Sequence, residues 1–248
     1  MRWKWFVTIG VLTIAISIAA AYVYLITYDY NKLKPLVARM VEDATGRKLS
    51  LGGDINLEIG FTPELVVTDV AFANAAWGSQ PQMIEIEKLQ AQVRLLPLLF
   101  KNVKVRYISL AGVKVLLETG PKAQGNWNFL AGSNATGSIG LFEPNAIEVN
   151  QVNIQNLHFT FHRHQTASPT QISIASLALI RKGTEDTLAL NIEADYNGQP
   201  LRLSGKTGRI HDLLAHKRFP LQLSGNLANA AVEINGAIDD VLNLQTWQ

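Results

Sequence analysis

The sequence contains no cysteine, and this absence removes several kinds of chemistry from consideration. Disulfide bonds, thiolate metal sites and thiol catalysis all require cysteine, although its absence does not fix the compartment. The sequence also lacks an excess of charge of one sign, because 22 basic residues accompany 20 acidic ones among 248 residues. Bulk binding to nucleic acid requires a concentrated basic face, so the sequence predicts no nucleic-acid partner.

A nucleotide site is excluded by one residue. Gly205-Lys206-Thr207 matches the end of a phosphate-binding loop, but Pro200 stands where the first glycine of that loop belongs. Proline has no N–H to offer to a phosphate, and the residues after Gly208 leave little room for a helix before Pro220. The sequence therefore predicts no nucleotide partner.

Candidate catalytic and metal-ligating side chains are few. Neither G-x-S-x-G nor H-E-x-x-H occurs. His158, His162 and His164 share one face of a predicted strand and are interpreted as its solvated face, without an acidic residue nearby to complete a metal site. Glu85 and Glu87 alternate with isoleucines and are interpreted in the same way. We therefore predict that the protein is not an enzyme and holds no cofactor or metal.

An apolar run without any charged residue extends from Phe6 to Ile26. At 1.5 Å per residue this run spans about 31 Å as a helix, close to the ~30 Å hydrocarbon thickness of a bilayer. Trp3 and Trp5 precede it and Tyr28 follows it, as aromatic belts do at the two lipid–water interfaces. The sequence predicts a transmembrane anchor over residues 1–28.

The basic residues Arg2 and Lys4 favour a cytoplasmic N-terminus for this anchor. A cleaved signal peptide is the alternative, because Ala19-Ala20-Ala21 offers a small-x-small cleavage site. The apolar run continues beyond that site, which favours a retained anchor. In both cases the rest of the chain is exported.

Residues 29–46 are predicted to form a short amphipathic helix that ends near Gly46. Its apolar stripe could lie on lipid or, more commonly, pack against the end of the domain that follows. The stripe consists of Leu33, Leu36, Val37, Met40, Val41 and Ala44.

Beyond Gly46 the apolar period changes to two, which predicts strands with one apolar and one wet face. Residues 47–130 form a first β segment and residues 146–248 a second, separated by a Gly/Ser-rich loop over 131–145. The predicted strands cover residues 49–61, 65–72, 83–95, 103–110, 113–118, 147–161, 171–179, 188–196, 201–204, 221–224 and 231–238.

Irregularities in the alternation predict bulges or bends at three places. Gly52-Gly53 could separate two strands, and the phase slips between Ile86 and Leu89 and between Ile154 and Leu157. The segments Leu201–Gly205 and Leu221–Gly225 repeat one another, and each is expected to be a short strand that ends at its glycine.

The apolar faces of these strands need a partner. The ordinary partner is a second sheet, which gives a sandwich or a closed barrel. The other solution is a curled antiparallel sheet whose apolar face stays open as a groove for acyl chains. Periodicity does not choose between them.

Three motifs, in this order, resemble the AsmA family of envelope proteins. The first couples the membrane helix and short helix to Thr45–Leu49 and Gly52–Ile55. The second leads from Val113–Val115 to Gly125–Leu130, and the third is Ala231–Asp239. The resemblance implies a periplasmic protein anchored in the inner membrane, with a lengthwise apolar groove similar to that of chorein-type bridge lipid-transfer proteins.

The resemblance favours the open groove and implies a role in passing phospholipids toward the outer membrane or maintaining its lipid balance. Phospholipid acyl chains and the inner membrane are then the expected partners, and a scaffold that binds envelope proteins is the alternative. Family members usually run longer, so the chain is expected to be a truncated form. The expected groove-lining residues are Leu49, Leu51, Ile55, Leu57, Ile59, Phe61, Val103, Val105, Leu157, Phe159, Phe161, Leu188, Leu190, Ile192, Leu201, Leu203, Leu221 and Leu223.

Overall fold

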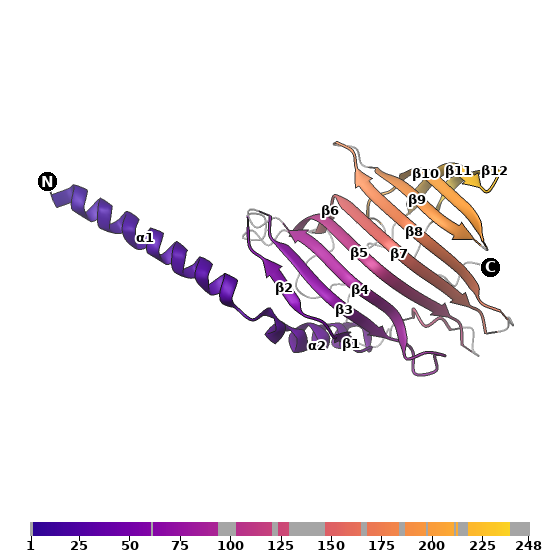
Figure 1. Ribbon diagram of the computed structural model, residues 1–248, viewed down its shortest axis with the longest axis horizontal. Coiled ribbons are helices and arrows are strands. Elements are labelled where there is room, and N and C mark those ends of the chain that lie inside the picture. Colours follow the sequence, from indigo (N-terminus) through magenta and orange to yellow (C-terminus); the bar gives the residue numbers. More distant parts are fainter. Residues whose placement is uncertain are drawn as a thin grey trace.

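The computed structural model consists of a lone helix, a short helical segment and one large sheet (Figure 1). It describes residues 2–60, 62–93, 103–120, 124–128, 147–164, 168–183, 187–196, 198–210, 212 and 218–238. The elements are α1 (Arg2–Thr27), η1 (Tyr30–Leu33), α2 (Lys34–Thr45), β1 (Leu49–Leu51), β2 (Ile55–Glu58), β3 (Glu64–Ala73), β4 (Gln82–Val93), β5 (Val103–Glu118), β6 (Ile147–Val149), β7 (Gln151–His162), β8 (Thr170–Arg181), β9 (Leu188–Tyr196), β10 (Gln199–Thr207), β11 (Phe219–Leu227) and β12 (Ala230–Ile238).

The apolar helix α1 extends away from the sheet by itself (Figure 1). Its residues Lys4–Thr27, 24 in number, are long and apolar enough to cross a membrane, and none of that window is buried. Trp5 is 74% exposed and Phe6 72%, while Ile26 at the other end is 51% exposed. At 1.5 Å per residue the stretch measures about 36 Å, which exceeds the ~30 Å hydrocarbon core of a bilayer. By length and composition α1 could therefore be a membrane anchor.

The joint between α1 and the sheet is held by specific contacts. The ring of Tyr28 lies 5.2 Å from that of Tyr30, and the Tyr30 hydroxyl donates to the carbonyl oxygen of Leu25 at 2.8 Å. The side-chain oxygen of Asn31 accepts a hydrogen bond from the N–H of Ile55, the first residue of β2, at 3.0 Å. The end of α1 is thereby connected to the first strands.

The predicted helix over residues 29–46 is divided into η1 and α2, and α2 itself spans only Lys34–Thr45. Pro35 lies in the first turn, and Gly46 ends the helix in the left-handed region with φ of 69°. Met40 and Val41 are half-buried where α2 lies against β1, whereas Leu36 is 51% exposed. The helix packs against its own domain, as the commoner of the two interpretations expected, and only its first turn leaves apolar surface uncovered.

All twelve described strands belong to one sheet, in the order β1-β3-β4-β5-β7-β8-β9-β10-β11-β12, with β2 beside β3 and β6 beside β5. The end strands β1 and β12 do not pair in this order, so the sheet is not closed. The open, mainly-β architecture is confirmed, and the alternative of a closed sandwich is wrong for the described strands. Figure 1 shows β10–β12 turned relative to β3–β8.

One pair of long neighbours departs from the antiparallel pattern. β5 runs parallel to both β6 and β7, whereas the other pairs are antiparallel. Parallel neighbours need a long crossover connection, and the chain between Glu118 and Ile147 supplies it. The predicted Gly/Ser-rich loop over 131–145 falls in that connection and lies outside the described residues.

The predicted phase slips are confirmed as one aligned irregularity, which we call the bulge seam. It consists of Asp69, Glu87, Gly112, Asn156 and Ala175, one residue in each of β3, β4, β5, β7 and β8. The pairing registers skip all five of them. The predicted strands 103–110 and 113–118 are therefore one strand, β5, that continues through the seam.

A buried polar cluster closes one end of β5. Asn126 is fully buried and donates hydrogen bonds to the Asn74 side-chain oxygen at 2.9 Å and the Leu116 carbonyl at 2.8 Å. Its own side-chain oxygen accepts from the N–H of Glu118 at 3.0 Å. Arg47 donates to the carbonyl oxygen of Asn126 at 3.0 Å, and burial lowers the pKa of Arg47 from its ordinary value. The cluster thus joins the first two sequence motifs of the family resemblance.

Replacing Asn126 by alanine should destabilise the fold, because it removes three buried hydrogen bonds made by the side chain. We expect the free energy of unfolding to fall by about 3 kcal/mol, since each buried group left unsatisfied costs roughly 1–3 kcal/mol. Denaturant unfolding followed by tryptophan fluorescence measures the change. The exposed neighbour Asn128, replaced by alanine, is the matched control, and equal losses in both variants would contradict the role of the cluster.

Candidate functional site

One face of the sheet is apolar along four rows that run across the strands. Residues that pair directly on neighbouring strands project from the same face of a sheet. Two of these rows cross from β2 to β12, and each is interrupted only by one glycine. The first row is Leu57–Leu65–Ala91–Ile108–Val152–Leu179–Leu190–Gly205–Leu223–Ile234, and the second is Ile55–Val67–Leu89–Leu110–Ile154–Leu177–Ile192–Leu203–Gly225–Val232.

Two further rows lie on the other side of the bulge seam and begin at β1. The same pairing registers define them. We call the surface made by all four rows the apolar face. The third row is Leu51–Val70–Ile86–Val113–Leu157–Ile174–Ala194–Leu201–Leu227–Ala230, and the fourth is Leu49–Phe72–Ile84–Val115–Phe159–Ile172–Tyr196.

The structure brings most of the predicted groove-lining residues together on the apolar face. More than half of them are members of the four rows. Phe161 and Leu221 continue the alternation of β7 and β11, and Leu188 continues that of β9. Val105 pairs with Val93 and Val149 at one end of β5. Ile59 follows β2 and is half-buried. Contact of these residues with lipid stays a prediction.

Several predicted positions lie outside the described residues. Phe61 is one of them, and so are the side chains of Val103 and of the anchor residue Trp3. The last ten residues of the chain, including Asp239 of the third motif, also lie outside the described residues.

The two copies of the Leu-x-Leu-Ser-Gly segment pair with each other. Ser204 lies opposite Ser224, so Leu203 faces Gly225 and Gly205 faces Leu223. Leu203 and Leu223 are buried and form a small core with Leu190. The expectation that Gly205 ends its strand is wrong, because β10 continues to Thr207. A Cβ at Gly205 would overlap the backbone of Gln222 on β11, so the glycine permits close strand approach rather than a turn.

Replacing Gly205 by alanine tests this close approach. The new methyl group has to displace the backbone of β11, and such overpacking typically costs about 1–3 kcal/mol. We expect the free energy of unfolding, measured by denaturant titration, to fall by that amount. A Cβ at Gly236 on β12 would meet no atom within 4 Å, so this glycine provides the matched control. A Gly236→Ala variant as unstable as Gly205→Ala would count against the explanation.

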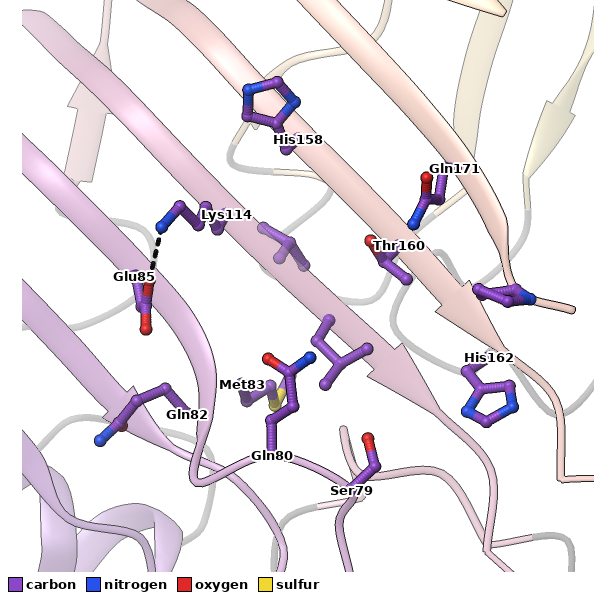
Figure 2. A pocket seen from close by; sticks show the side chains of 13 residues that line it. Ser79, Gln80, Gln82, Met83, Glu85, Lys114, His158, Thr160, His162 and Gln171 are labelled. Atoms are coloured by element: carbon purple, nitrogen blue, oxygen red, sulfur yellow. Dashed lines mark hydrogen bonds and ion pairs between the residues drawn. The ribbon is translucent and has the colours of Figure 1, made fainter. Parts of the chain in front are cut away.

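The opposite face of the sheet is polar. A row of facing residues runs across it through Glu85, Lys114, His158, Ser173 and Asp195. Lys114 and Glu85 form an ion pair at 3.2 Å, and the Nδ1 atom of His158 lies 3.2 Å from the hydroxyl of Ser173. Figure 2 shows Glu85, Lys114 and His158 among the side chains that line a hollow of about 320 Å³.

The histidines and glutamates interpreted as solvated side chains are not all fully exposed. His158, His164 and Glu87 are exposed, whereas His162 and Glu85 are partly buried, and His164 lies beyond β7 instead of on it. Among the described residues no three His, Asp or Glu side chains are grouped as metal ligands would be.

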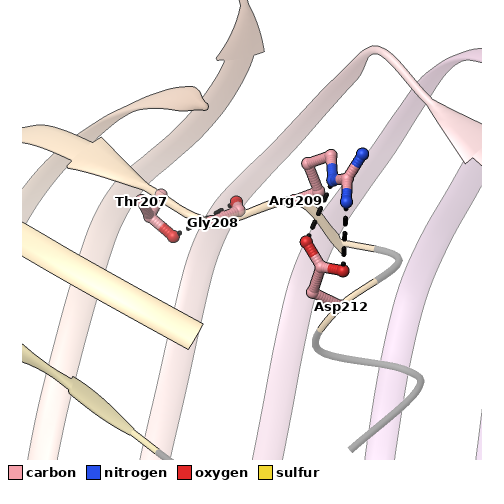
Figure 3. A network of polar contacts seen from close by, with 4 residues as sticks. All are labelled: Thr207, Gly208, Arg209 and Asp212. Atoms are coloured by element: carbon pink, nitrogen blue, oxygen red, sulfur yellow. Dashed lines mark hydrogen bonds and ion pairs between the residues drawn. The ribbon is translucent and has the colours of Figure 1, made fainter. Parts of the chain in front are cut away.

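The Gly-Lys-Thr stretch lies in a strand and its continuation. Lys206 and Thr207 are the last residues of β10, and Thr207 is 1% exposed. Its hydroxyl lies 3.4 Å from the carbonyl oxygen of Gly208. Beyond it, Arg209 and Asp212 form an ion pair with 3.0 Å between Nε and Oδ2 (Figure 3). This strand geometry differs from the strand–loop–helix of a phosphate-binding loop.

Sequence reasoning missed two features of the site. The buried cluster around Asn126 was not predicted, although Asn126 belongs to the second motif. The parallel pairing of β5 with β7 has no signal in the alternation itself, because period two is common to both kinds of pairing. The alternation did identify most of the apolar face, since nearly all members of the rows lie on the predicted strands. The exceptions are Gly205, Gly225, Leu227 and Ala230, which lie just beyond the predicted ends.

Taken together, these features define a class of protein in which an apolar helix precedes an open sheet with one continuous apolar face. The chain belongs to the AsmA family, whose sequence model matches residues 4–177. It is also similar to the AsmA family protein YhjG of Escherichia coli (strain K12), with 24% identity over 276 residues, 95% of this chain and 39% of that protein. The chain thus spans about two fifths of the length of this relative. The AsmA family is associated with the cell envelope and is not a known enzyme family.

Proposed function

We propose that the protein binds phospholipids along its apolar face and conducts them away from the membrane that holds α1. The observation that carries this proposal is the pair of apolar rows that cross the sheet from β2 to β12. A large apolar surface on a single unclosed sheet is an aggregation hazard unless something apolar covers it. Acyl chains are a cover that needs no specific side-chain chemistry.

The direction of the rows supports this proposal. In Figure 1 the strand order runs away from α1, so the rows run outward from the anchor, crossing the strands instead of following them. Strands lie about 4.8 Å apart, so a row of ten residues extends about 43 Å. One leaflet contributes about 15 Å of a ~30 Å hydrocarbon core, so a row could hold more than one acyl chain end to end.

The energetics favour occupancy by acyl chains. Each CH₂ group moved from water to an apolar surface contributes about 0.8 kcal/mol. Neighbouring positions along a row offer similar aliphatic side chains, so a chain can shift along the row at little cost. The polar face keeps the outside of the sheet wetted. We place the N-terminus in the cytoplasm, α1 in the inner membrane and the sheet in the periplasm, where it would contribute to outer-membrane lipid balance.

A photo-crosslinking amino acid on the apolar face should capture phospholipid in cells. We expect p-benzoylphenylalanine at Phe159 or at Leu57 to yield lipid adducts, because both positions lie on apolar rows. The adjacent residues His158 and Asn56 are exposed on the polar face and provide matched controls on the same strands. Mass spectrometry of the irradiated protein measures the adducts.

The controls decide between this function and a protein scaffold for envelope partners. Lipid adducts severalfold more abundant at Phe159 and Leu57 than at His158 and Asn56 would support the lipid path. Adducts to protein alone at all four positions, or equal lipid capture on both faces, would contradict it. Protein adducts would then favour the scaffold.

A further inference from the structure

The bulge seam runs from the break between β1 and β2, through β3, β4, β5 and β7, to β8. Gly52 and Gly53, between β1 and β2, donate their N–H groups to the carbonyl oxygens of Asp69 at 2.8 Å and Thr68 at 3.1 Å. The break between these two short strands therefore lies at the level of Asp69 in β3. On the far side, Ala175 of β8 has no counterpart in β9, where Ala194 and Glu193 pair with Ile174 and Ser176. The seam thus ends between β8 and β9.

The residues of the seam suit its backbone geometry. Asp69, Gly112 and Asn156 have φ values of 52°, 63° and 54°, in the left-handed region. Glycine, asparagine and aspartate are the residues that visit this region most readily. The side chain of Glu87 also occupies the space that a Cβ at Gly112 would take. The irregularity is therefore encoded separately in β3, β5 and β7.

The apolar pattern alone does not fix how these strands align. Side chains alternate with a period of two, so a strand that slips by two residues keeps its apolar residues on the apolar face. The rows consist largely of similar aliphatic side chains, so a slipped strand would meet similar neighbours. All described strands share one sheet, so no second described sheet packs on this face to select a register. The seam residues do distinguish the registers, because a slip by two residues moves the seam residue of one strand away from the seam residues of the adjacent strands.

We propose that the bulge seam is a register lock, which aligns the strands from β1 to β8 and keeps the apolar rows continuous. Each strand carries one extra residue, and the extra residues are accommodated together only when they lie side by side. If one strand were out of register, its extra residue would no longer lie beside the extra residues of the neighbouring strands. The hydrogen bonds between the strands would then be interrupted at two places instead of one. The lock is a property of the sheet and holds whether or not lipid is the ligand.

Moving one seam residue tests the lock without changing composition. In the relocated variant Asn156 is deleted and an asparagine is inserted between His158 and Phe159. Chain length and apolar alternation on both sides of the insertion stay the same. The lock predicts that β7 slips by two residues relative to β8 to restore the alignment with Ala175.

Cysteine pairs report the register, because the full chain has no cysteine of its own. Thr160 faces Gln171 in the native register, whereas Ser173 faces His158 and would face Thr160 after the slip. Thr160→Cys with Gln171→Cys is the native reporter, and Thr160→Cys with Ser173→Cys is the slipped reporter. Disulfide formation in the purified full-length protein is measured for both reporters in both backgrounds.

In the wild-type background we expect the native reporter to form its disulfide and the slipped reporter not to. In the relocated variant, the disulfide yield of the slipped reporter should rise severalfold and that of the native reporter should fall severalfold. Native-register disulfides at wild-type levels in the relocated variant would overturn the proposal.

If the relocated variant does not fold, the melting temperatures of two glycine variants test the proposal instead. Asn156→Gly should leave the melting temperature unchanged or raise it, since glycine adopts the left-handed region without strain. Asn153→Gly on the same strand, at a regular paired position, should lower it by a few degrees. Equal losses from both substitutions would show that Asn156 is not held in the seam geometry and would also overturn the proposal.

Discussion

The fold depends on hydrogen-bonded ladders between strands, because a single sheet holds all the described strands and gives its apolar side chains no opposing sheet. In a sandwich two apolar faces bury one another, and interdigitating side chains select one packing. In this single sheet, one arrangement of the strands has to be selected by other means. These are the hydrogen-bonded ladders, the bulge seam and the pairing of the two Leu-x-Leu-Ser-Gly segments. The buried core around Leu190, Leu203 and Leu223 forms where those segments meet.

The same constraint connects structure with proposed function. An apolar face that is not covered by a second sheet is costly in water and favourable toward hydrocarbon. The anchor joint, in which Asn31 accepts a hydrogen bond from Ile55, places the first member of an apolar row close to the end of α1. The buried cluster of Asn126 fixes the far end of β5 and the chain that follows it. Both features hold the rows in place relative to the anchor.

Much of this fold could be predicted from alternation, and what escaped prediction has a physical reason. Leu57 and Phe159 were assigned to the apolar face because period two separates the two sides of a strand. The slip from Ile154 to Leu157 indicated a bulge, but alternation within one strand says nothing about where neighbouring bulges lie. Gly205 was mistaken for a strand end, since a glycine that allows close strand approach looks the same in sequence as one that turns. Asn126 became recognisable only when Asn74 and Glu118 were brought beside it.

Whether the apolar face carries phospholipid is tested most directly by the lipid content of the purified protein. The measurement is mass spectrometry of residues 29–248, prepared without α1 and without detergent so that no membrane or micelle lipid accompanies the protein. We expect phospholipid to co-purify with the protein, and polar substitution of Leu57 and Phe159 together to lower its amount. A folded, monodisperse preparation that contains no lipid would show that the apolar face does not carry phospholipid.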